Sequence, residues 1–216
     1  NPFFQALNKI IDTVVLSLIY TLFLVPSVFM AYVVITQGFY IFFVLLFVIG
    51  MALVGPATTA LYYAMVKVIR RERGYALREY FHSFKLNFRQ GAVIGMIFGF
   101  LMGLLYFDYK FVNESLQAEA GTMNMIMLIG FNAVVILMVL VSTYIFPLLS
   151  RFSLPIDQFF KSALFMSIRH LPSTLLMILI NLAGAFVIWW FFPLPLFFVI
   201  PGLCMLLDSF LMEKIF

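Results

Sequence analysis

The two histidines and the acidic residues near them are the first candidates for chemistry in this sequence. Glu79 and His82 stand three residues apart, which places both side chains on one face of a helix. A zinc site takes three or four nitrogen, sulfur or carboxylate ligands, and no second pair of this kind accompanies them. Ser167 and Asp157 lie near His170 in sequence, but no nucleophile-elbow motif surrounds them. The pattern predicts a solvated polar helix face at His82, with neither a metal site nor a hydrolytic centre.

Other cofactor chemistries lack their residues as well. The glycines lie within long apolar stretches rather than after a strand, and no Walker-type lysine follows them, so no phosphate-binding loop is expected. The single cysteine, Cys204, rules out a disulfide framework and a thiolate metal cluster. We therefore expect no cofactor, no nucleic-acid partner and no enzymatic activity.

Composition points to lipid as the solvent. The chain has 216 residues, of which 65% are hydrophobic and 10% charged, and its mean hydropathy is +1.12. A soluble domain carries roughly 25% charged and about 45–50% apolar residues. A water-soluble globule is therefore excluded, and a polytopic membrane protein is predicted.

The spacing of the charges sets the expected membrane spans. Between Asp12 and Lys67 lie 54 uncharged residues; as one helix they would reach about 80 Å, against a hydrocarbon core of about 30 Å. This stretch must turn once, and residues 36–38 (Thr-Gln-Gly) are the break. Residues 171–207 are also too long for one crossing and break at residues 193–195 (Pro-Leu-Pro). The expected spans are 13–35, 39–66, 90–108, 123–149, 171–192 and 195–212.

The predicted fold is thus an all-α helical membrane bundle of five or six spans, forming one domain over residues 1–216. We expect the sixth span to kink at Pro201 and Gly202. A re-entrant or interfacial segment is the alternative for this last stretch.

The distribution of lysine and arginine predicts the orientation. With six spans, 12 of the 13 basic residues fall on one side and only Lys110 on the other, so both termini should be cytoplasmic. A five-span arrangement would move only Lys214. The first apolar stretch is too long for the core of a cleaved signal peptide, and a second span follows it closely, so no cleavage is expected.

Residues 75–89 form a predicted amphipathic helix at the cytoplasmic boundary. Leu77, Phe81, Phe84 and Phe88 recur at helical spacing, so we expect them to be buried in the interface with the cations facing outward. The cations would face anionic lipids of the cytoplasmic leaflet or form a docking surface for another protein. The residues assigned to this surface are Arg70, Arg71, Arg73, Arg78, Lys85 and Arg89.

A ridge of glycines follows on the next span. Its members, spaced four residues apart, are Gly91, Gly95, Gly99 and Gly103. Without side chains, this ridge lets a neighbouring backbone approach closely. The preceding span offers a ridge of small residues at Ala52, Pro56, Ala60 and Ala64. We expect the two ridges to pack within one chain, the alternative being a seam between subunits.

Two stretches of the sequence look alike. Each has a proline-bearing span, with Pro56 or Pro147, then an amphipathic segment and a returning span. Residues 80–83 (Tyr-Phe-His-Ser) correspond to residues 159–162 (Phe-Phe-Lys-Ser), and both prolines are expected to shape the bundle. The charge count gives both units one orientation, so the repeat would be parallel. Chance similarity in a phenylalanine-rich sequence is the alternative.

Few ionisable residues are expected inside the membrane, where they would mark an ion or substrate path. Asp208 is the one acid expected below the headgroups, and we predict that it snorkels or pairs with Lys214 rather than relaying protons. Asn132 and Asn181 are expected to form hydrogen bonds across helices. The scarcity of buried charge argues against a proton- or sodium-coupled transporter.

Five strings, in order and spanning nearly the whole chain, resemble the YesL-like family of bacterial integral membrane proteins. They are residues 55–63, 80–90, 146–152, 163–172 and 210–216. The resemblance implies a plasma membrane protein of the Gram-positive type. It also implies relatives whose genes lie beside those of oligosaccharide importers of the ATP-binding-cassette (ABC) type and of sugar-binding lipoproteins. It brings no established catalytic or binding residues.

Our leading hypothesis is an auxiliary membrane subunit of a carbohydrate ABC importer, with the importer permeases or a sugar-binding protein as partners. The alternative is a stand-alone facilitator or channel for small solutes. Its polar path would be lined by Thr58, Thr59, Asn132, Ser142 and Asn181. A membrane enzyme is the weakest interpretation, because no nucleophile, base or metal set converges.

Overall fold

The computed structural model describes residues 2–37, 41–70, 75–118, 122–190, 198–213 and 215. Within these ranges the chain forms seven α-helices and no strand, which confirms the all-α class. The helices are α1 (Pro2–Gln37), α2 (Ile41–Arg70), α3 (Ala76–Ala118), α4 (Thr122–Arg151), α5 (Ile156–Arg169), α6 (Leu171–Trp190) and α7 (Ile200–Glu213). Helix α1 ends within the break predicted at residues 36–38, whereas the break predicted at residues 193–195 lies outside the described residues.

Five of these helices are long and apolar enough to cross a membrane, so the chain is a multi-pass helical membrane protein. They are α1, α2, α3, α4 and α6. Helix α7 has 14 residues, or about 21 Å, less than the hydrocarbon core of about 30 Å. The predicted kink at Pro201 is wrong, because Pro201 stands in the first turn of α7. A proline is tolerated there, since its missing N–H would have no partner within the helix.

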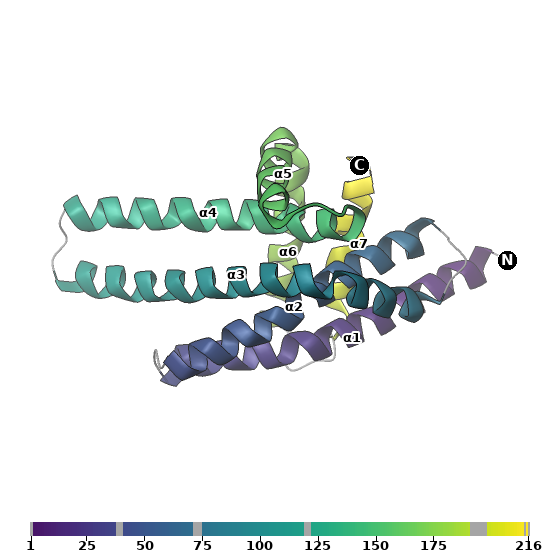
Figure 1. Ribbon diagram of the computed structural model, residues 1–216, viewed down its shortest axis with the longest axis horizontal. Coiled ribbons are helices and arrows are strands. Elements are labelled where there is room, and N and C mark those ends of the chain that lie inside the picture. Colours follow the sequence, from purple (N-terminus) through teal and green to yellow (C-terminus); the bar gives the residue numbers. More distant parts are fainter. Residues whose placement is uncertain are drawn as a thin grey trace.

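The helices form two long pairs and a crossing group (Figure 1). Helix α1 lies beside α2 and α3 beside α4, while α7 runs across the long pairs toward the C-terminal end of the chain. Helix α2 is central, since it packs against α1, α3, α4 and α7. The C-terminal end of α3 and the N-terminal end of α4 project beyond the other helices in this view.

The closest contact between helices is that of α2 with α3. A Cβ atom on Gly55 would meet the carbonyl oxygen of Gly91, and one on Gly95 would meet that of Met51. A Cβ atom on Gly91 would also meet the backbone of Pro56. The glycine ridge therefore lies against α2 of the same chain, and the two backbones touch.

The residues of α2 that meet the glycines differ from the ridge expected. They are Val44, Val48, Met51, Gly55 and Pro56. Of the expected small residues, only Pro56 is among them, whereas Ala60 and Ala64 belong to a buried cluster with Tyr80. The antiparallel register explains the difference, because Lys67 pairs with Glu79 and so sets Ala60 and Ala64 opposite α3 residues that precede Gly91.

Helix α3 differs from the separate amphipathic helix and span predicted. It is one continuous helix of 43 residues, and no proline interrupts it between residues 76 and 118. Tyr80 and Ser83 are fully buried and Phe84 stacks on Phe23 of α1 at 5.1 Å between ring centroids. Phe81 is 44% exposed.

Of the apolar stripe on residues 75–89, only Phe84 faces the interior of the protein, and burial of the stripe in the membrane interface stays a prediction. Leu77 and Phe88 are exposed like Phe81. The reason is that contact with α2 selects the buried face. That face contains Tyr80, Ser83, Asn87 and Gly91, which are spaced three or four residues apart and so lie on one side of the helix.

The second unit has a similar buried aromatic but a broken helix. Phe159 of α5 is fully buried, as Tyr80 is in α3. Helix α5 ends at Arg169 and α6 begins at Leu171, with His170 in a non-helical conformation between them. Pro172 accounts for the break, because it lacks the N–H that a continuing helix would use and its ring would clash with the carbonyl group four residues earlier.

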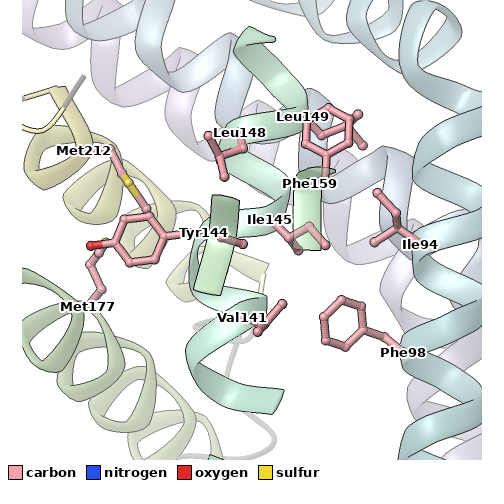
Figure 2. Packing of buried hydrophobic residues seen from close by; sticks show 11 residues of the cluster. Ile94, Phe98, Val141, Tyr144, Ile145, Leu148, Leu149, Phe159, Met177 and Met212 are labelled. Atoms are coloured by element: carbon pink, nitrogen blue, oxygen red, sulfur yellow. The ribbon is translucent and has the colours of Figure 1, made fainter. Parts of the chain in front are cut away.

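A core cluster on α4 joins this unit to the rest (Figure 2). Tyr144 points toward Met177 of α6 and Met212 of α7, and its hydroxyl lies 3.1 Å from that of Thr174. Phe159 lies beside Leu149 in the same cluster. The two units thus correspond in one respect, since each buries an aromatic side chain. Tyr80 and Phe159 belong to two separate clusters.

We expect Gly95→Ala to lower the thermal unfolding midpoint of the protein in nanodiscs. Its Cβ meets the backbone of Met51, which moves only with α2, so a cost of about 1–3 kcal/mol is expected. Gly130→Ala is the matched control, because nothing lies within 4 Å of a Cβ at that position. It should leave the midpoint unchanged or raise it, since alanine favours helix by about 1 kcal/mol over glycine. Equal shifts for both variants would contradict the close α2–α3 contact.

Candidate functional site

A cavity of about 560 Å³ lies among six helices, α1, α2, α3, α4, α6 and α7. Methionine and aromatic side chains supply most of its apolar wall. They are Met51, Met102, Met138, Met205, Tyr20, Tyr62, Phe98 and Phe146. Its volume falls within the range of about 300–1,000 Å³ typical of small-molecule sites. This cavity is the strongest candidate for a functional site among the described residues.

The polar groups of the cavity include Asp208 on α7. The Asp208 side chain is 1% exposed, and its Oδ2 accepts a hydrogen bond from Asn181 Nδ2 at 2.7 Å. The Tyr62 hydroxyl donates to the same oxygen at 3.3 Å. Next to Tyr62 on α2, the Thr58 hydroxyl lies 3.4 Å from that of Tyr20. Side chains of α2 and α6 therefore donate hydrogen bonds to one buried carboxyl group on α7.

The predictions for these residues are partly wrong. Asp208 neither snorkels to the interface nor is exposed, and Lys214 lies outside the described residues. The hydrogen bond of Asn181 across helices is confirmed. Asn132 instead donates to the carbonyl of Leu128 in its own helix, at 2.8 Å, and is exposed.

Contacts between α7 and its neighbours hold Asp208 in place. Ser17 of α1 accepts the backbone N–H of Gly202 at 2.9 Å, and a Cβ on Gly202 would meet the Ser17 side chain. On the other side, a Cβ on Gly184 of α6 would meet the Cys204 sulfur. Small residues on α6 and α7 thus allow the close approach that brings Asn181 to Asp208.

The polar path expected for a facilitator is only partly assembled. Thr58, Ser142 and Asn181 line the cavity, and Thr143 joins them. Thr59 is not among the lining residues and donates to the carbonyl of Gly55. Asn132 lies apart from the cavity on an exposed part of α4.

Basic and acidic side chains tie together the helix ends on one side of the molecule. Arg70 Nε of α2 lies 2.6 Å from Glu213 Oε1 of α7, and Arg151 of α4 lies 4.0 Å from the same oxygen. Lys67 pairs with Glu79 at 2.6 Å. Sequence reasoning missed Glu213; its position among cations at the end of the last apolar stretch was the available signal.

The remaining basic residues assigned to a partner or lipid surface divide in two groups. Arg78, Lys85 and Arg89 are exposed along the first part of α3. Arg71 and Arg73 lie outside the described residues. With the exposed Leu77, Phe81, Leu86 and Phe88, the three arginine and lysine residues form what we call the α3 face.

The histidines do not gather ligands around them. His82 is exposed, and its helix neighbour Glu79 pairs with Lys67. Near His170, the Ser167 hydroxyl donates to the carbonyl of Leu164 and Asp157 lies 3.8 Å from Lys161. Across the described residues, no group of three or more histidine, cysteine or acidic side chains is placed to hold a metal ion.

We expect Asn181→Leu to destabilise the protein, because it removes a donor from the buried Asp208 carboxyl group. Loss of a partner for a buried polar group costs about 1–3 kcal/mol. Asn132→Leu is the control, since Asn132 is exposed and donates to the carbonyl of Leu128 in its own helix. Thermal unfolding in nanodiscs should show a lower midpoint for Asn181→Leu and little change for Asn132→Leu. The opposite order would refute the role assigned to Asn181.

Comparison with known proteins identifies a relationship in the first half of the chain. The model of a family described as a protein of unknown function, DUF624, matches residues 14–109. This family is known as YesL-like. No curated protein and no solved structure matches the chain. The matched region contains the glycine ridge, the α3 face and the cavity residues Thr58 and Tyr62, but not Asn181 or Asp208. The chain is a multi-pass helical membrane protein whose N-terminal half is similar to the DUF624, or YesL-like, family.

Proposed function

We propose that this protein is a non-catalytic auxiliary subunit that associates with a carbohydrate ABC importer in a bacterial plasma membrane. In this arrangement the α3 face is cytoplasmic, as are both termini. The observation that carries the proposal is the composition of that face, where cations and large apolar side chains are exposed together. The class of partner, importer permeases or a sugar-binding protein, rests on the resemblance to the YesL-like family.

The α3 face has the chemistry of a contact surface. Leu86 is 72% exposed, and it lies next to Lys85 in the chain. Aromatic and arginine side chains are enriched where proteins bind one another, because they combine large apolar area with directed polar groups. Anionic lipid headgroups are the competing occupant, since each exposed cation near a membrane surface attracts them.

The double variant Arg78→Glu/Lys85→Glu tests this surface. We expect at least a tenfold loss of importer permease recovered with the tagged protein after gentle-detergent purification from its own membranes. Lys161→Glu/Arg169→Glu is the matched control, because it reverses the same number of exposed charges on α5. It should leave the recovery of permease unchanged.

Two results would contradict the proposal. If the wild-type protein purifies without permease or sugar-binding protein, the proposed association with an importer is excluded. If equal amounts of permease are recovered with both double variants, the α3 face is not the contact surface. A loss of bound phosphatidylglycerol in the α3 variant, measured by native mass spectrometry with the permease still present, would assign the face to lipid. Accessibility of both termini to protease should be the same in all variants, which controls for a changed orientation.

The cavity favours the second candidate, a facilitator for small solutes. On this function, Ser142→Trp should block solute flux into proteoliposomes, because Ser142 lines the cavity. Asn132→Trp should leave flux unchanged, since Asn132 lies outside it. Absence of flux in wild-type proteoliposomes, or equal flux in the two variants, would exclude a path through this cavity.

A further inference from the structure

We propose that the cavity binds an organic cation, an N–H-bearing ammonium group joined to an apolar body, with the ammonium group held by Asp208. This site is independent of the importer association proposed above. Its residues lie on six helices around the cavity, whereas the α3 face is formed by exposed side chains at the start of α3.

The hydrogen bonding of the Asp208 carboxyl group points to a cationic ligand. Asp208 Oδ2 receives hydrogen bonds from Asn181 and Tyr62, but the buried Oδ1 has no hydrogen-bond partner among the residues that the structure describes. Among the described residues that line the cavity, none is a lysine, arginine or histidine. A carboxylate removed from water needs an opposite charge or further donors. An ammonium group supplies both.

The wall around that carboxyl group favours a ligand with an apolar body. Met51, Met102, Met138 and Met205 come from four different elements and adapt to ligands of varied shape, because the methionine side chain is unbranched and flexible. Tyr20, Tyr62, Phe98 and Phe146 add aromatic rings, which attract cations and pack against apolar groups. A cavity that is mostly apolar and carries one acid fits an amphiphile with one charged group.

A metal ion fits this site less well. Ca²⁺ takes six to eight oxygen ligands and Mg²⁺ takes six. Here the amide of Asn181 turns its nitrogen toward Asp208, since Nδ2 donates to both Asp208 Oδ2 and the carbonyl of Met177. The donors around Asp208 therefore serve the carboxylate rather than supplying a set of oxygen ligands to a cation.

The test uses the full chain in phosphatidylglycerol nanodiscs and dansylcadaverine as probe. This dye carries a primary ammonium group on an apolar ring system, and its emission rises in an apolar environment. We expect a saturable increase in emission with wild-type protein, above that of empty nanodiscs. The neutral analogue dansyl pentylamide, which lacks the amine, should bind at least tenfold more weakly.

Asp208→Asn should weaken dansylcadaverine binding at least tenfold and leave the neutral analogue unaffected. Asp157→Asn is the matched control, because it removes an exposed carboxylate on α5. Its binding should equal that of the wild type. If Asp208→Asn does not fold, Met138→Trp provides the test, because it fills the cavity from α4 and leaves the partners of Asp208 in place.

Three results would overturn the proposal: no saturable binding to the wild type, equal binding of the amine and its neutral analogue, or undiminished binding to a folded Asp208→Asn or Met138→Trp variant. Nanodiscs that contain phosphatidylethanolamine distinguish the source of the natural ammonium group. Weaker dansylcadaverine binding in these nanodiscs assigns the site to a lipid amine, and unchanged binding assigns it to a free ammonium compound.

Discussion

The contact of α2 with α3 at their glycines is the constraint on which the other packing depends. Helices in lipid gain little from burying apolar surface against each other, so their association depends on close van der Waals contact. Gly55, Gly91 and Gly95 allow the two backbones to touch. Because α2 also packs against α1, α4 and α7, its register on α3 sets where these helices can lie. It also leaves Thr58 and Tyr62 to face the cavity.

Polar contacts, rather than length, determine the position of α7. This helix is too short to cross the hydrocarbon core alone, and it carries a carboxyl group that is costly to bury. Ser17 at one end and Glu213 at the other tie it to α1, α2 and α4. A buried acid that needs donors from two other helices adds little stability compared with an apolar residue. This cost is the physical reason to look for function at Asp208.

The residue types and their spacing predict what depends on local pattern: the helical class, the end of the first helix near Gln37 and the ridge of glycines. They do not predict which face of residues 75–89 is buried. A helix with apolar residues on several faces can turn any of them inward, and contact with α2 selects Tyr80 and Ser83. Nor do they predict the partners of Asp208, because Tyr62 and Asn181 lie 146 and 27 residues away in the chain. Such pairs follow only from the assembled bundle.

The two similar units place their aromatic segments on differently connected helices. In the first unit no proline follows Tyr80, so α3 continues without a break from Arg78 and Lys85 to the cavity residues Phe98 and Met102. In the second, Pro172 separates α5 from α6, and Phe159 is therefore on a different helix from Asn181. The exposed α3 face and part of the cavity wall thus lie on one unbroken helix, whereas the surface of α5 and Asn181 lie on two helices that meet at Pro172.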